Sequence, residues 1–244
     1  MIRFIIVLIA VIFFLIVSLP IQLVLWLIRF VSPSVCDTVS RAIVGWAFRV
    51  CIWLSGVKLT VIGEENVPKD RPVLYISNHR SFYYIILTYC RVPRATGYIS
   101  KKSVKRVPSL STWMMLMNCL FLDRDDIKQG MEVIKKAIDH INNGISIYVC
   151  PEGTRNKTDE PILDFHAGTF KIAERTGCTI IPITMVNSEQ IFEAHLPKIK
   201  SAHVILEYGK PIETKDMSRA ERKQVPGMTH DIIKETYLKN LSLV

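Results

Sequence analysis

The stretch Pro72–Cys90 reads PVLYISNHRSFYYIILTYC and joins two apolar runs through a short polar turn. The first run, Pro72 to Ser77, is short and mostly apolar, which predicts a buried strand. The second run, Phe82 to Cys90, predicts a helix that begins beside the turn. His79 lies in the turn, just after the strand.

Strands and helices continue to alternate beyond this stretch. Further strands are predicted at 57–62, 96–100, 119–122, 145–149, 179–185 and 203–208, and further helices at 113–117, 127–141, 170–175 and 229–241. This order predicts an α/β fold with a mainly parallel sheet flanked by helices. Chemistry in such folds lies at the carboxyl ends of the strands, where His79, Asp123-Arg124 and Glu152 all fall.

The N-terminal residues 4–28 are apolar apart from an interruption at Ser18, Pro20 and Gln22. A stretch of this length predicts a membrane-anchoring helical segment. The rival hypothesis, a cleaved signal peptide, is disfavoured because the apolar core is too long and no small-x-small cleavage site follows. Spanning and re-entering the bilayer both stay open, because a proline can form a kink or a turn.

The next stretch, Val35 to Ser55, has apolar residues at helical spacing. It is either an ordinary amphipathic core helix or an interfacial helix beside the anchor, with Trp46 and Trp53 at the membrane–water boundary. We therefore divide the chain into membrane-anchoring and interfacial helices at 1–55 and a catalytic domain at 56–244.

The 244-residue chain carries a net charge of +9. Such a balance favours nucleic acid or an anionic membrane surface as a partner. We expect no nucleic acid, because no zinc-finger, helix-turn-helix or RNA-binding signature occurs. The membrane is favoured, and the densest basic cluster consists of Lys101, Lys102, Lys105 and Arg106.

The six cysteines are widely spaced, and no pair has the short spacing of a zinc or redox motif. This pattern predicts free thiols in a reducing compartment, without disulfides and without a structural metal.

His79 has the features of a general base, because a neutral imidazole near pH 7 can accept a proton from a hydroxyl. Such a base usually has a carboxylate behind it. No Asp or Glu lies between His79 and Asp123, and the residue five positions after the histidine is Tyr84.

Three other segments complete a pattern. They are Phe121-Leu122-Asp123-Arg124 at a strand exit, the polar turn Pro151-Glu152-Gly153-Thr154-Arg155, and the proline-broken strand Ile180-Ile181-Pro182-Ile183. Each segment alone is a weak signal, since a lone histidine is more often structural than catalytic and a polar turn is often an ordinary loop.

Together, in this order and spacing, the segments resemble the glycerolipid acyltransferases, specifically the bacterial 1-acyl-glycerol-3-phosphate acyltransferase type, over about residues 56–210. The first motif of that family is Asn-His, four residues, then Asp. Asn78, His79 and Ser81 match it, but Tyr84 stands at the Asp position.

The second motif of the family usually begins with Gly, where this chain has Asn118, while Phe121 and Arg124 match. The third motif matches fully from Glu152 to Arg155, and the fourth matches through Pro182.

The resemblance implies transfer of an acyl group from acyl-CoA or acyl-carrier protein to the free hydroxyl of lysophosphatidic acid, giving phosphatidic acid in phospholipid synthesis. It implies no cofactor beyond the acyl donor, membrane lipids as partners, and a site at the cell membrane that faces the cytoplasm. An acyltransferase for another lyso-lipid and a non-catalytic lipid-binding relative remain as alternatives. A soluble hydrolase is disfavoured because no Gly-x-Ser-x-Gly elbow occurs.

The implied catalytic residues are His79 as the base, Tyr84 in place of the Asp, and Glu152, which orients a cation or accepts from the glycerol hydroxyl. The phosphate requires cations. The implied substrate-binding residues are Asn78, Ser81, Lys101, Arg124, Gly153, Thr154, Arg155 and Pro182.

Tyr84 permits three interpretations. A phenol can accept a hydrogen bond from imidazole but cannot offset the charge of an imidazolium. The enzyme is therefore weakened or inactive, or His79 works unassisted or with another group, or a different carboxylate, such as Asp123 or Glu152, lies beside the imidazole in the fold.

Overall fold

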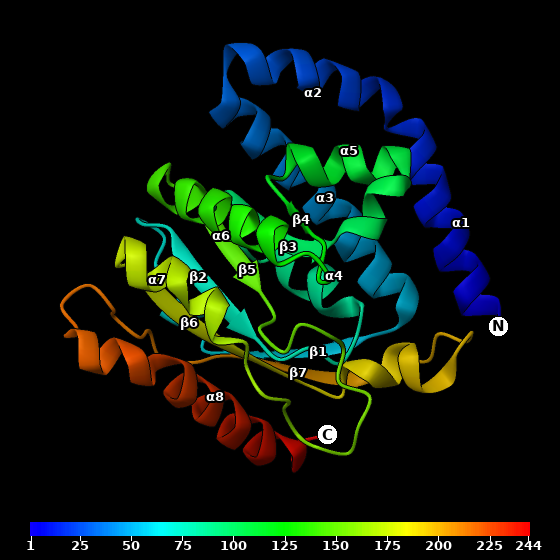
Figure 1. Ribbon diagram of the computed structural model, residues 1–244. Helices are drawn as coiled ribbons and strands as arrows, with labels where there is room; N and C mark the ends of the chain where they lie inside the picture. The colour runs from blue at the N-terminus through cyan, green and yellow to red at the C-terminus, as the bar shows by residue number, and fades with distance from the viewer.

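A seven-stranded sheet forms the centre of the molecule in the computed structural model, which describes residues 1–244 (Figure 1). The strand order is β1-β7-β6-β2-β5-β3-β4. Neighbouring strands are parallel, except for β6 and β7, which are antiparallel. The strands are β1 (Lys58–Ile62), β2 (Val73–Ser77), β3 (Thr96–Lys101), β4 (Leu120–Leu122), β5 (Ser146–Val149), β6 (Thr179–Val186) and β7 (His203–Tyr208).

The predicted mainly parallel sheet is confirmed, and every predicted strand occurs within one residue of its expected bounds. The reason lies in burial. All residues of β2, β5 and β6 are buried, as expected for strands with helices on both faces. Such strands are continuous apolar runs, which are easy to recognise in a sequence.

Two helical layers cover the sheet. One layer consists of α1 (Ile2–Val17), α2 (Leu19–Val31), α3 (Pro33–Ser55), α4 (Tyr83–Tyr89) and α5 (Pro108–Leu116); the other consists of α6 (Ile127–Asn142), α7 (Lys171–Thr176) and α8 (Arg219–Leu241). Five short 3₁₀ helices lie in the connections: η1 (Glu64–Asn66), η2 (Lys102–Arg106), η3 (Ala167–Phe170), η4 (Ser188–Ile191) and η5 (Glu193–His195).

The predicted start of the last helix, at residue 229, is wrong, because α8 begins ten residues earlier at Arg219. Pro226 and Gly227 lie inside the helix and are ordinarily signals of its end. A capping box between Ser218 and Glu221 begins α8 instead, since each residue bonds the other's backbone N–H.

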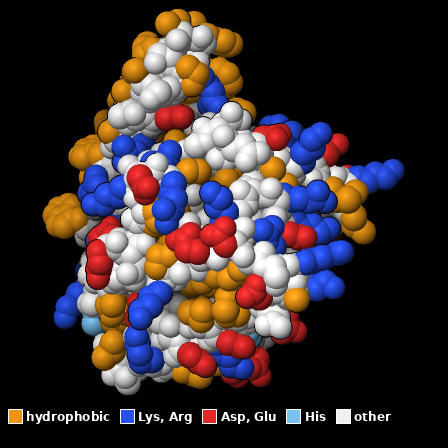
Figure 2. Space-filling view, turned by 90° about the vertical axis from the view of Figure 1, so that its left-hand side faces the viewer, with side chains coloured by type: hydrophobic (Ala, Val, Ile, Leu, Met, Phe, Trp, Pro, Cys, Tyr) orange, Lys and Arg blue, Asp and Glu red, His pale blue; other side chains and the backbone are white.

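The N-terminal helices form an arc over α3 and α5 (Figure 1). No single helix is long and apolar enough to cross a membrane, whereas α1 and α2, bent by 50° at their junction, together satisfy the length and composition criteria. Many of their apolar side chains are exposed, including Phe13 at 65% and Phe30 at 81%. Hydrophobic side chains gather on the projecting upper end of the molecule in Figure 2, at the height of α2 in Figure 1.

Polar contacts fix the bend between α1 and α2 onto α5. The indole N–H of Trp113 donates to Ser18 Oγ at 2.9 Å, and the amide of Gln22 donates to Ser109 Oγ at 2.8 Å. The ring of Phe14 stacks on Trp113 with 5.7 Å between centroids. The bent pair is therefore packed into the body of the protein.

The helix α3 presents different residues to the core and to the surface. Its inner face is buried through residues such as Val44, Ala47 and Cys51. Its two tryptophans point outward, with Trp46 61% and Trp53 77% exposed. It is a core helix on one side and presents indole rings on the other.

Candidate active site

The carboxyl ends of β2 and β5 bring two of the sequence motifs together. These strands are parallel neighbours, with Ile76 opposite Val149. The turn that contains His79 follows β2, and the turn 151–155 follows β5. The Asp123-Arg124 segment follows β4 at the same edge of the sheet, because β5, β3 and β4 are also parallel.

The carboxylate of Glu152 joins the backbone of the two turns. Its Oε1 accepts a hydrogen bond from the backbone N–H of His79, and its Oε2 accepts from the N–H of Leu163 at 2.9 Å. Burial raises the pKa of Glu152 to about 7, although the two amides lower it. Glu152 therefore positions the backbone of His79, a role that differs from the predicted contact with a cation or the glycerol hydroxyl.

The side chain of Asn78 is bound on both sides by Met185 of β6. Its amide donates to the Met185 carbonyl, and its carbonyl accepts from the Met185 N–H, both at 2.8 Å. Asn78 is 1% exposed. The side chain therefore fixes the turn, and its contact with substrate stays a prediction.

Ser81 has a similar structural role. Its hydroxyl donates to Glu193 Oε2 at 2.7 Å and accepts from the backbone N–H of Tyr83 at 3.0 Å. The residue is completely buried. Its hydroxyl is therefore engaged within the protein, and its contact with substrate stays a prediction.

The imidazole of His79 is 9% exposed, and its Nδ1 has no hydrogen-bond partner. Burial, together with the nearby charges of Arg124 and Arg155, lowers its pKa to about 4. The ring is therefore neutral at pH 7, which is the form that can accept a proton.

The interpretation that another carboxylate supports the imidazole is wrong. Asp123 pairs with Lys102 at 3.1 Å on the surface. Glu152 contacts only the backbone of His79. The structure thus leaves the first two interpretations of Tyr84 open.

Tyr84 meets the His79 ring edge-on, with 4.9 Å between centroids and an interplanar angle of 71°. Its own ring packs against Tyr148 and Tyr98, at 5.8 and 6.2 Å. Burial raises the pKa of Tyr84 above its usual value, and the neighbouring Cys150 contributes. Tyr84 is therefore a neutral member of an aromatic cluster, and its hydroxyl makes no hydrogen bond to the imidazole.

Two of the three predicted phosphate-binding cations lie near His79. Arg155 stacks on Phe82, with its guanidinium carbon 3.7 Å from the ring centroid. Arg124 is exposed and forms no ion pair, and its charge lowers the pKa of His79. Lys101 is exposed at the end of β3, and the hydrogen bond from Lys102, with a smaller contribution from the charge of Lys101, lowers the pKa of Asp123.

The tight turn at Gly153 requires glycine. Its φ is +68°, and a Cβ there would lie 2.8 Å from the ring of His166. Thr154 is exposed on the same turn. Pro182, in contrast, is buried inside β6 opposite Ile76, and its contact with substrate stays a prediction.

The sequence pattern missed Arg80, Glu189 and Glu193. The guanidinium of Arg80 donates to the carbonyls of Thr158 and Glu160, at 3.1 and 2.9 Å, and its Nε lies 3.6 Å from Glu189. Nothing in the spacing of these residues marks them, because their partners come from distant parts of the chain.

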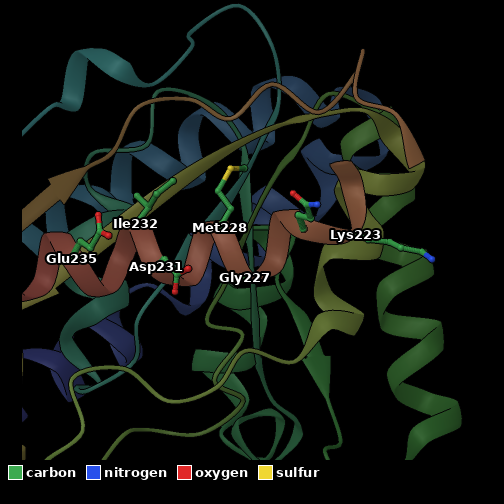
Figure 3. A pocket seen from close by; sticks show the side chains of 7 residues that line it. Lys223, Gly227, Met228, Asp231, Ile232 and Glu235 are labelled. Carbon is green, nitrogen blue, oxygen red and sulfur yellow. The ribbon is translucent and has the colours of Figure 1, made fainter. Parts of the chain in front are cut away.

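Two surface hollows lie away from the His79 turn. One hollow, of about 560 Å³, lies along α8. It is lined by Lys223, Gln224, Gly227, Met228, Asp231, Ile232 and Glu235 (Figure 3). The other, of about 230 Å³, lies between α5, β4 and α6. No cluster of three His, Cys, Asp or Glu side chains suited to a metal ion occurs.

Residues 58–186 match the sequence profile of the Acyltransferase family. The chain belongs to this family. It is 27% identical over 185 residues to the 1-acyl-sn-glycerol-3-phosphate acyltransferase of Borreliella burgdorferi, a match that covers 76% of this chain and 74% of that protein. It is 27% identical over 213 residues to the protein of the same name from Haemophilus influenzae, covering 85% and 84%.

The acyltransferase chain is also 29% identical over 174 residues to the Saccharomyces cerevisiae 1-acyl-sn-glycerol-3-phosphate acyltransferase, covering 70% of this chain but only 57% of the yeast protein. Its fold matches the crystal structure of the 1-acyl-sn-glycerophosphate acyltransferase PlsC from Thermotoga maritima, with a TM-score of 0.71, 22% identity, and coverage of 92% and 96%. The family predicted from the four motifs is thus confirmed.

Proposed function

We propose that this acyltransferase moves a fatty acyl group from an acyl thioester to the free hydroxyl of lysophosphatidic acid and so forms phosphatidic acid. The observation that carries this proposal is the neutral, buried imidazole of His79 close to the guanidinium groups of Arg124 and Arg155. A base beside two cations suits an acceptor that carries a hydroxyl and a phosphate on neighbouring carbons.

In the proposed reaction, His79 takes the proton of the glycerol hydroxyl as its oxygen attacks the thioester carbonyl. The tetrahedral intermediate then collapses, the C–S bond breaks, and the departing thiolate receives the proton. Since the thioester is already activated and the thiolate is a good leaving group, no further cofactor is required. Either acyl-CoA or acyl-carrier protein satisfies this chemistry.

The acceptor phosphate has a second effect in this site. In the free protein, the charges of Arg124 and Arg155 oppose protonation of His79. A bound phosphate offsets both charges, so the imidazolium becomes less costly when the acceptor is in place. This effect replaces part of what a carboxylate at position 84 would supply.

With Tyr84 in this site, we expect slower acyl transfer than in an enzyme that has an Asp at position 84. Removal of the Asp from a serine-protease triad lowers the rate by about 10⁴-fold. A thioester is more reactive than an amide, so we expect a smaller loss here.

We propose that α1 and α2 attach the protein to the cytoplasmic face of the cell membrane. Their exposed apolar side chains include Phe13 and Phe30. The exposed basic cluster defined by Lys101, Lys102, Lys105 and Arg106 adjoins α5, which packs against α2. Cations beside an apolar surface favour anionic lipid headgroups.

The proposal is tested with the full chain in phospholipid vesicles, given lysophosphatidic acid and either donor. We expect phosphatidic acid from the parent protein, no product from His79→Ala, and nearly full activity from His203→Ala on strand β7. If neither the parent nor Tyr84→Asp transfers acyl groups from either donor, the substrate assignment fails.

A second candidate function, lipid binding without turnover, is motivated by the unpartnered Nδ1 of His79. This function would be supported if the parent protein and Tyr84→Asp both bind lysophosphatidic acid and neither acylates it. Transfer to another lyso-lipid in preference to lysophosphatidic acid would instead indicate a related acyltransferase.

A further inference from the structure

The segment after β6 places two carboxylates against the motif turns. This segment, η4 and η5, begins beyond residue 186, where the family match ends. Glu189 lies 3.6 Å from Nε of Arg80, and Glu193 lies 3.6 Å from Nη1 of Arg155. Both carboxylates thus join this segment to arginines of the motif turns.

Glu193 connects the first motif with the third. Its Oε2 accepts from the hydroxyl of Ser81 at 2.7 Å, and its Oε1 accepts from the backbone N–H of Phe82 at 2.6 Å. The same Oε1 faces the guanidinium of Arg155. The carboxylate is 12% exposed, so these contacts are poorly screened by solvent.

Arg155 is consequently held from two directions. Its guanidinium carbon lies over the ring of Phe82, and the backbone of Phe82 is itself held by Glu193. The 3.6 Å separation between Arg155 and Glu193 is longer than that of a strong charge-assisted hydrogen bond, which is about 2.8 Å. Glu193 thus restrains Arg155, while the N–H groups of Arg155 remain available to another anion.

We propose that Glu193 is a positioning residue for the acceptor phosphate. It orders Arg155 beside His79 before the acceptor arrives, which lowers the conformational entropy lost on binding. The inference rests on the proposed function, in which Arg155 contacts the phosphate of lysophosphatidic acid.

The test is a double-mutant cycle that combines Glu193→Gln with Arg155→Ala. Glutamine keeps an acceptor for the Ser81–Phe82 turn but removes the charge that faces Arg155. We expect Glu193→Gln to raise the KM for lysophosphatidic acid about tenfold and to change kcat by less than about twofold. In the Arg155→Ala background, the same substitution should have no further effect on KM.

Equal losses from Glu193→Gln in both backgrounds would overturn the proposal, because Glu193 would then act independently of Arg155. A fall in kcat without a rise in KM would also overturn it. The matched control is Glu235→Gln on the exposed face of α8 (Figure 3), which should leave both constants unchanged.

Two further measurements distinguish failure of the positioning role of Glu193 from failure of the proposed function. Calorimetric binding of lysophosphatidic acid repeats the cycle without turnover and should show the same loss of coupling in the Arg155→Ala background. Glu193→Asp retains the charge and should recover most of the affinity lost in Glu193→Gln. If the parent protein neither binds nor acylates lysophosphatidic acid, the proposed function fails, whereas failure of the positioning role appears only among the variants.

Discussion

The rings of His79 and Tyr84 meet edge-on at 4.9 Å, in a place where a carboxylate would otherwise support the imidazole. Tyr84→Asp should therefore raise kcat, by between about 10-fold and 10⁴-fold, because an anion would stabilise the imidazolium. The initial rate of acyl transfer measures this effect. Tyr84→Phe is the matched control and should leave the rate unchanged, since the phenol makes no bond to the imidazole.

The same substitution should lower stability. Tyr84 packs against Tyr98 and Tyr148, and loss of a buried aromatic side chain costs about 3–5 kcal/mol. Denaturant unfolding of Tyr84→Asp, compared with Tyr84→Phe, measures the cost of the missing ring. An unchanged rate in Tyr84→Asp, together with an inactive His79→Ala, would contradict the role assigned to position 84.

The pH profile should report the depressed pKa of His79. Because its folded pKa is about 4, kcat/KM should stay flat from pH 8 to about pH 5 and then fall as the imidazole becomes protonated. The acidic limb of kcat should lie at higher pH, because bound phosphate offsets Arg124 and Arg155. Initial rates give the acidic limbs of kcat/KM and kcat once they are corrected for the titration of the phosphate of the acceptor itself. Coincident limbs would exclude the effect of the phosphate on His79.

The stability of the protein should also depend on the titration of His79. A histidine whose pKa falls from 6.5 to about 4 on folding favours the folded state above pH 6.5. This contribution, about 3 kcal/mol, is lost as the pH falls from 6.5 towards 4. His79→Asn should therefore unfold with a weaker dependence on pH in this interval than the parent protein.

Glu152→Ala should reduce both stability and kcat. It removes the acceptor of two backbone N–H groups, those of His79 and Leu163, and each unsatisfied group costs about 1–3 kcal/mol. Glu152→Gln, which keeps one acceptor, should lie between the parent and Glu152→Ala. Unfolding and initial-rate measurements test the order, and an equal loss for the two variants would argue against the proposed backbone role.

Gly153→Ala should destabilise the protein by about 1–3 kcal/mol, because its φ of +68° strains any other residue and its Cβ meets His166. Gly168→Ala in η3 is a matched control, because a Cβ there has nothing within 4 Å. Adding His166→Ala to Gly153→Ala should remove the steric part of the loss and leave the backbone strain. Differential scanning calorimetry of the parent protein and these three variants separates the steric loss from the backbone strain.

The fold could be predicted from sequence more fully than the site. Buried strands such as β2 and β6 are visible as apolar runs, whatever lies around them. The start of α8 was missed because the capping box at Ser218 outweighs Pro226 and Gly227 only when the helix has a surface to pack on. Local propensity does not contain that information.

The site depends on contacts between distant segments. Asn78 and Pro182 belong to recognisable motifs, but the motif does not tell whether a side chain faces substrate or the backbone of another strand. Glu193 is 111 residues from Phe82, whose N–H it accepts. Such a partner becomes visible only after the sheet has placed both segments at one edge.

The contact between the N-terminal helices and the body of the protein has a practical consequence for preparing it. Trp113 is 2% exposed because Ser18 and Phe14 cover it, and Phe4 of α1 stacks on Phe192, the neighbour of Glu193, at 5.8 Å. A shortened protein that starts after α2 would expose these rings to solvent and loosen the segment that carries Glu193. The full chain, with α1 and α2 in place, is therefore the form in which the acyltransferase should be prepared and assayed.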